Sequence, residues 1–187
     1  SLVVFKFWIW QIFTYAFFHV DLMHLFLNLL MLAFFGGDLN QLWGTRAFLR
    51  YYFFCSIFAG FCFLLMQFFV SAIHTPMVGA SGGIFGLLVA YGIVFSERTI
   101  LAFLMFPMKV KHFIWIAAAA EFMAMVFGSN SNVSNVAHLG GMAGGFGYLW
   151  VTAYMKTRKK KDSPGFFERR KREKARSHLK LVKSDRE

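Results

Sequence analysis

Apolar residues form long runs along this chain, and short polar stretches separate the runs. The first run has an N-cap candidate in Asp21 and a helix-ending pair in Gly36 and Gly37. A chain built from such runs is typical of a membrane protein. We therefore predict an all-α polytopic membrane helix bundle with five spans, over residues 22–35, 46–70, 81–95, 112–127 and 137–154.

The stretches between these runs are predicted to lie at the membrane surface or in loops. Residues 1–18 are rich in Trp, Phe and Tyr, which suits a membrane-skimming loop or short interfacial helices. Residues 99–111 are apolar but are broken by Pro107, so we place them at an interface as well. Polar turns are predicted over residues 36–46 and 128–135.

Composition supports a membrane protein and excludes an ordinary soluble domain. Hydrophobic residues make up 58% of the 187-residue chain, aromatic residues 20% and charged residues only 16%. Residues 156–187 hold 14 of the 20 Lys and Arg and 5 of the 9 acidic residues, a net charge of +9. We divide the chain into a membrane domain, residues 1–155, and a basic tail, residues 156–187.

The remaining charges predict the orientation in the membrane. Basic residues flank the turn after the first span and the connector after the third, whereas the opposite side has only Lys6. By the positive-inside rule the tail is cytoplasmic, where it can touch anionic lipid, and Ser81 lies near the outer face. The tail lacks the interleaved aromatic residues of a folded nucleic-acid site, so we expect no nucleic-acid partner.

Candidate chemistry begins at Ser81, which opens the third apolar run between Gly79 and Gly82. A serine in the first turn of a helix lies where the helix dipole favours negative charge, which suits a nucleophile. Small residues in a membrane helix also have a purely structural interpretation, because they let helices pack closely. The partners of Ser81 decide between the two interpretations.

His138 opens the last apolar run at a depth similar to that of Ser81. Each of the two runs carries a pair of small residues, Gly82 and Gly86 on one and Gly141 and Gly145 on the other. Such pairs let two helix backbones approach closely, which would bring an imidazole within hydrogen-bond reach of the serine as a general base. The alternative is a histidine whose nitrogens are satisfied by backbone carbonyls.

His24 and Asn28 are four residues apart, so they project from one face near the outer end of the first span. Polar residues inside a membrane are costly and usually functional, and two donors near a serine can form an oxyanion hole. His19 lies before this helix and is expected to brace the loop. The three histidines His19, His24 and His138 could instead bind a metal, but no His-Glu-x-x-His motif is present, so we expect no metal and no cofactor.

Together these motifs resemble the rhomboid family of intramembrane serine proteases. The resemblance extends over roughly residues 7–155, and its motifs occur in order at a consistent depth. The residues that carry it are His19-x4-His24-x3-Asn28, Gly79-x-Ser81-Gly82 and His138-x2-Gly141-x3-Gly145.

The resemblance implies roles for the site residues. Ser81 and His138 would form a catalytic dyad without a third acidic member. His24, Asn28 and the backbone amide of Ser81 would stabilise the oxyanion.

Other residues would support that site. Gly79 would give the preceding loop its tight geometry, and Phe85 would lie against the His138 ring, although plain core packing also explains an aromatic residue there. Gly82, Gly141 and Gly145 would keep the two helices close.

The family also implies a function and a larger bundle. The protein would be a serine endopeptidase that cuts in or near transmembrane segments of other membrane proteins. The family core has six helices, so the family's first helix is missing from the five spans predicted here. Residues 112–127, which carry Glu121, are our candidate for a mobile wall where substrate enters.

Two other functions stay open at this point. A catalytically inactive relative would bind transmembrane clients without cutting them, and loss of Ser81 or His138 would mark it. A channel or transporter fits the hydropathy, but it does not explain why the polar residues converge at one depth near one face.

Overall fold

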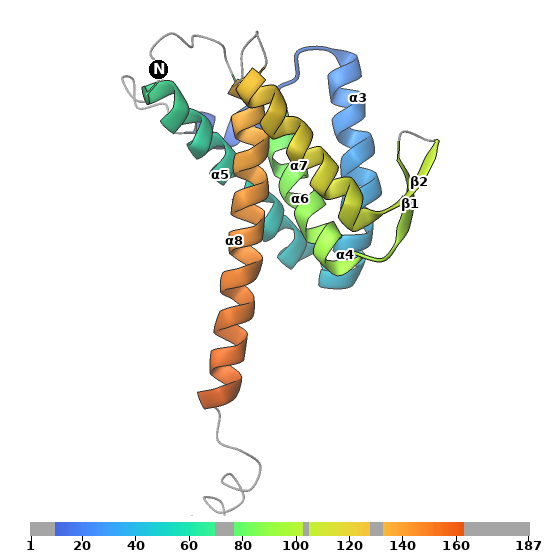
Figure 1. Ribbon diagram of the computed structural model, residues 1–187. Helices are drawn as coiled ribbons and strands as arrows, with labels where there is room; N and C mark the ends of the chain where they lie inside the picture. The colour runs from blue at the N-terminus through green and yellow to red at the C-terminus, as the bar shows by residue number, and fades with distance from the viewer. Residues whose placement is uncertain (1–9, 70–76, 103–104, 128–132, 163–187) are drawn as a thin grey trace, which may run out of the picture. The chain divides into compact units, whose positions relative to one another are not determined.

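The structure is a computed structural model that describes residues 10–69, 77–102, 105–127 and 133–162 (Figure 1). The chain forms two units, residues 1–149 and 150–187. The elements, in chain order, are α2 (Gln11–Thr14), η1 (Tyr15–Phe17), α3 (Leu22–Met31), the π-helical turn η2 (Leu32–Gly36), α4 (Gly37–Trp43), α5 (Thr45–Phe69), α6 (Ser81–Val94), β1 (Thr99–Ala102), β2 (Phe106–Lys109), α7 (Val110–Phe127) and α8 (Val133–Asp162). Helices dominate the described residues, which confirms the predicted class of all-α membrane bundle.

The first long helix begins where the sequence indicated but ends later. Asp21 caps α3 by accepting a hydrogen bond from the backbone N–H of His24 at 2.7 Å. The predicted end at Gly36 and Gly37 is wrong, because η2 and α4 continue the helix to Trp43. A Cβ on Gly36 would lie 3.1 Å from a ring carbon of Phe48, so this glycine admits a side chain of α5 instead of ending the helix.

Two other boundaries differ from the prediction. Residues 99–111 contain the antiparallel hairpin β1–β2, in which Leu101 pairs with Pro107. Proline is tolerated there because each strand of a two-stranded ribbon has a free edge. Helix α8 begins at Val133, inside the predicted loop, and continues past residue 154 because Lys and Arg are good helix formers. Residues 128–132 of that loop and the tail beyond Asp162 lie outside the described residues.

The aromatic N-terminal segment is helical where it is described, and it packs inward. Residues 1–9 lie outside the described residues, and α2 and η1 follow as short helices. Tyr15 is buried, and its hydroxyl donates to the backbone carbonyl of Ser56 in α5 at 2.7 Å. This part of the segment is therefore held against the bundle.

Helix α6 forms the centre of the first unit. It contacts α5, α7, η2 and α3, and Leu87, Ala90 and Tyr91 are among its fully covered side chains. A Cβ on Gly82 would lie 2.6 Å from the Cβ of Ala59 in α5, so small residues face one another across this contact. The packing holds the first turn of α6 at a fixed position.

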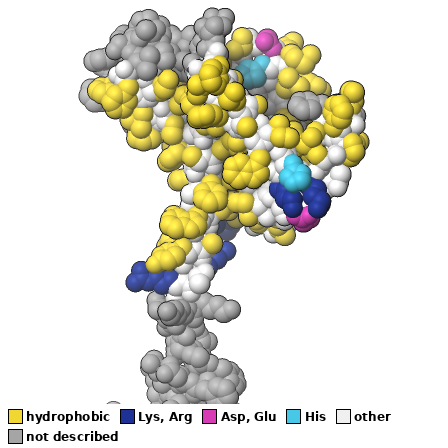
Figure 2. Space-filling view, viewed as in Figure 1, with side chains coloured by type: hydrophobic (Ala, Val, Ile, Leu, Met, Phe, Trp, Pro, Cys, Tyr) yellow, Lys and Arg dark blue, Asp and Glu magenta, His cyan; other side chains and the backbone are white. Residues whose placement is uncertain are grey.

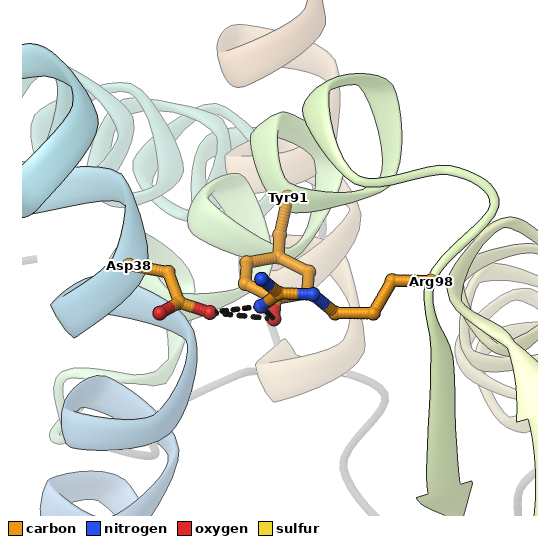
Figure 3. A network of polar contacts seen from close by, with 3 residues as sticks. All are labelled: Asp38, Tyr91 and Arg98. Carbon is orange, nitrogen blue, oxygen red and sulfur yellow. Dashed lines mark hydrogen bonds and ion pairs between the residues drawn. The ribbon is translucent and has the colours of Figure 1, made fainter.

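A polar network fixes the opposite end of α6 (Figure 3). Tyr91 donates to Oδ2 of Asp38 in α4 at 2.9 Å, and Arg98 donates to both Asp38 Oδ2 and the Tyr91 hydroxyl. The guanidinium also lies over the ring of Phe95, 4.4 Å from its centroid. These contacts tie α4 to the end of α6.

Three described helical stretches are long and apolar enough to cross a membrane: Leu22–Trp43, Thr45–Phe69 and Val110–Phe127. Helix α6 has 14 residues, so its length is about 21 Å, less than the roughly 30 Å of a bilayer core. Among the described residues on the face shown in Figure 2, hydrophobic side chains predominate. The protein is an integral membrane helix bundle, and the count of five spans stays a prediction.

Candidate active site

The site begins at Ser81, the first residue of α6, which is half-buried. Gly79 precedes it with a φ of +110°, a conformation that favours glycine, and its N–H donates to the carbonyl of Tyr15 at 3.1 Å. A Cβ on Gly79 would lie 2.8 Å from the His24 ring. The loop therefore needs glycine for both its backbone conformation and its contact with His24.

Ser81 and His138 are joined directly. The Ser81 Oγ lies 2.7 Å from Nε2 of His138, which enters from the second turn of α8. The ring of Phe85, one turn after the serine, stacks on the imidazole with the centroids 4.3 Å apart and the planes at 14°. Hydrogen bonding at one nitrogen and stacking on one face fix both the position and the tilt of the imidazole.

Backbone contact between α6 and α8 makes this approach possible. A Cβ on Gly141 would lie 1.9 Å from the carbonyl oxygen of Gly82, and one on Gly145 would lie 3.1 Å from the Cα of Gly86. Any side chain larger than hydrogen at Gly141 would therefore push the helices apart. The glycine pairs predicted from the sequence face each other in the structure.

Two more histidines and an asparagine come from the α3 side. The His24 ring lies against Gly79, and the His19 ring meets it edge-on with the centroids 5.1 Å apart. Asn28 is buried, and its Nδ2 donates to the backbone carbonyl of His24 at 2.8 Å. That bond uses one of the two donors of the amide group.

Among the described residues, no group of three or more His, Cys, Asp and Glu side chains is arranged to hold a metal ion. The residues around Ser81 instead have the chemistry of acyl transfer. A serine hydroxyl hydrogen-bonded to an imidazole is an activated nucleophile, and the first amides of α6 lie beside it.

Glu121 of α7 also lies beside His138, a placement that the sequence did not predict. Its Oε2 lies 3.0 Å from Nδ1 of His138, a close contact that does not meet the geometry of a regular hydrogen bond. The same oxygen accepts a hydrogen bond from Nδ2 of Asn135 at 2.7 Å. The signal in the sequence was a carboxylate alone in an apolar segment, which is costly in a membrane without a partner.

Sequence comparisons relate this chain to known proteins. A sequence model of one family, described as "Rhomboid domain", matches residues 6–155. The chain is 35% identical over 143 residues to "Rhomboid protein 1, mitochondrial" of Saccharomyces cerevisiae, covering 72% of this chain and 39% of that protein. It is 34% identical over 155 residues to "RHOMBOID-like protein 1" of Arabidopsis thaliana, covering 78% of this chain and 35% of that protein.

The chain thus spans well under half the length of these two relatives. No solved structure gives a significant match.

Proposed function

The chain belongs to the rhomboid family, and from this premise we propose that it is an intramembrane serine endopeptidase. Its substrates are membrane proteins, cut in or near their transmembrane segments. The observation that carries the proposal is the 2.7 Å contact between Ser81 Oγ and His138 Nε2 inside a helix bundle.

The reaction needs only these two side chains for its proton transfers. Ser81 Oγ attacks the carbonyl carbon of the scissile bond, and its proton passes to His138 Nε2. Collapse of the tetrahedral intermediate breaks the C–N bond, and Nε2 returns the proton to the leaving amine. Water then attacks the acyl-enzyme by the same route, which releases the new carboxylate and restores the serine.

The negative oxygen of the intermediate requires donors. The amide N–H of Ser81, the side chain of Asn28 and the ring of His24 supply them in this proposal, and the contact between His24 and Gly79 supports it. His19, edge-on to His24, acts as a brace. Phe85 stacks on the imidazole and keeps its tilt fixed.

The same proposal includes an orientation in the membrane. Arg98, Lys109 and Lys111 lie around the end of α6 that is distant from Ser81, which supports placing that end in the cytoplasm. The active site then opens near the outer face, and the basic tail touches anionic lipid on the cytoplasmic side.

Substrate entry past α7 completes the proposal. Of the described side chains of α7, only Val110 is buried, and large residues such as Trp115 and Phe127 are exposed. Apart from Glu121, which contacts His138 and Asn135, few side chains hold this helix, so its exposed part is suited to shifting for a transmembrane segment.

Cleavage of a model transmembrane substrate in proteoliposomes tests the proposal. We expect the wild-type chain to cut the substrate and to react with a fluorophosphonate, and Ser81→Ala to do neither. Ser96→Ala removes a hydroxyl just beyond the other end of α6 and should behave as wild type. Binding of the substrate without cleavage by the wild type would favour an inactive client-binding protein instead.

A further inference from the structure

We propose that Glu121 is a positioning residue that makes the Ser81–His138 pair a three-member relay. The inference rests on the proposed function and adds to it an acidic member that the resemblance did not imply. The carboxylate orients the imidazole through Nδ1 and stabilises the positive charge that His138 carries during the reaction.

Glu121 lies on the side of the His138 ring that faces away from Ser81. His138 uses Nε2 for Ser81, so Nδ1 points away from the serine, and Oε2 of Glu121 lies 3.0 Å from it. The two side chains are only 17% and 18% exposed, which limits competition from water. Among the described residues, Nδ1 makes no regular hydrogen bond, so the charge contact with Glu121 is the polar contact that orients this side of the ring.

The chemistry requires a particular tautomer of the histidine. Nε2 can accept the serine proton only when the imidazole proton is on Nδ1. A carboxylate beside Nδ1 favours that tautomer, because its negative charge attracts the N–H and repels a lone pair. Once Nε2 is protonated, the imidazolium lies 3.0 Å from a negative charge in a partly water-excluded site.

Asn135 holds the carboxylate in place. It lies three residues before His138 on α8, one turn away, and donates to the same Oε2 at 2.7 Å. The acid of α7 is therefore aligned by the same helix that carries the base.

The test compares two substitutions of Glu121 in the full chain. Glu121→Gln keeps the size and can still accept from Asn135, so it removes mainly the charge. Glu121→Asp keeps the charge on a shorter side chain. We expect Gln to lower kcat about 10- to 100-fold with KM within about 2-fold, and Asp to recover part of kcat. Glu97→Gln, a carboxylate at the other end of α6, is the matched control and should leave kcat unchanged.

A proton NMR signature separates positioning from general destabilisation. With ¹⁵N-labelled histidine, we expect a downfield Nδ1–H resonance of His138 that moves upfield in Glu121→Gln and disappears in His138→Ala. A fall in kcat with an unmoved resonance would overturn the inference, because the carboxylate would then act elsewhere.

The remaining outcomes distinguish this inference from the proposed function. If the wild type cleaves and Glu121→Gln keeps its kcat, or loses only substrate affinity, the relay is wrong and the protease stands. If the wild type neither cleaves nor labels at Ser81, the proposed function fails and the relay fails with it.

Discussion

The two ends of α6 gather polar groups in contrasting ways. At the N-terminal end, Ser81 meets His138 in one hydrogen bond and stays half-buried. At the C-terminal end, Asp38, Tyr91 and Arg98 bond to one another, and a single carboxylate oxygen receives two donors. The first arrangement leaves the serine oxygen partly accessible, and the second uses its polar groups to join α4 to the end of α6.

The two ends of α6 also differ in how their neighbouring helices pack. Near Ser81 the helices touch through backbone, because a Cβ on Gly141 would lie 1.9 Å from the Gly82 carbonyl. Near Tyr91 they touch through rings, as in the edge-on contact with Phe35 at 5.0 Å between centroids. Backbone contacts cannot adjust to an added atom, whereas side chains can change rotamer. Substitutions should therefore disturb chemistry at the first end and mainly stability at the second.

The largest effect is expected from Gly141→Ala, at the Ser81 end of α6. The added methyl must separate α6 from α8, which moves Ser81 away from His138. We expect cleavage to fall by about 100-fold or more, since a displacement of about 1 Å can have that effect. Overpacking should also lower the free energy of unfolding by about 1–3 kcal/mol. Single-turnover cleavage and thermal unfolding measure the two effects.

Gly147→Ala is the matched control on the same helix. A Cβ there meets nothing within 4 Å, so cleavage and stability should stay near the wild type. Wild-type cleavage by Gly141→Ala would show that the two helices can separate without losing the serine–histidine contact.

Part of the site and of the fold could be predicted from the sequence. The closeness of Ser81 and His138 follows from glycines spaced four apart on two helices, a local pattern that carries its own packing rule. The cap at Asp21 can also be predicted from a local pattern, because a capping side chain contacts only the first turn of the helix that it begins. The roles of these residues in a reaction stay predictions that Ser81→Ala tests.

Other features depend on partners that no local pattern reveals. Gly36 and Gly37 resemble a helix end, yet Phe48 of the next helix packs on Gly36 and the helix continues. Glu121 lies in α7, and only the packing of α7 against α8 brings it to His138. The hairpin at residues 99–109 depends on pairing between its two strands, and an apolar stretch interrupted by Pro107 does not predict that pairing.

A smaller effect is expected from Asp38→Asn at the other end of α6. The change removes the charge opposite Arg98 and weakens the bond from Tyr91. We expect a loss of about 1 kcal/mol in the free energy of unfolding, because the pair is partly exposed. The cleavage rate should change by less than about 2-fold, since the site is at the far end of the helix.

Asp21→Asn provides the control for removing a carboxylate. Asparagine caps a helix about as well as aspartate, so the free energy of unfolding should change little. If Asp38→Asn reduced cleavage as strongly as Gly141→Ala, the two ends of α6 would not be separable in function.

The smallest effect concerns Glu97, just beyond α6, where the carboxylate accepts hydrogen bonds from Lys109 and Lys111. These lysines lower the pKa of Glu97 from 4.5 to about 2. A lowered pKa stabilises the fold above the unfolded value, and this contribution disappears as pH falls from 4.5 to about 2. Thermal unfolding of wild type and Glu97→Gln should therefore differ slightly at neutral pH, less in high salt, and not at all once both are neutral. If the difference in thermal stability between wild type and Glu97→Gln persisted at low pH, Glu97 would act through packing and not through its charge. The C-terminal end of α6 would then depend on close packing, as the Ser81 end does.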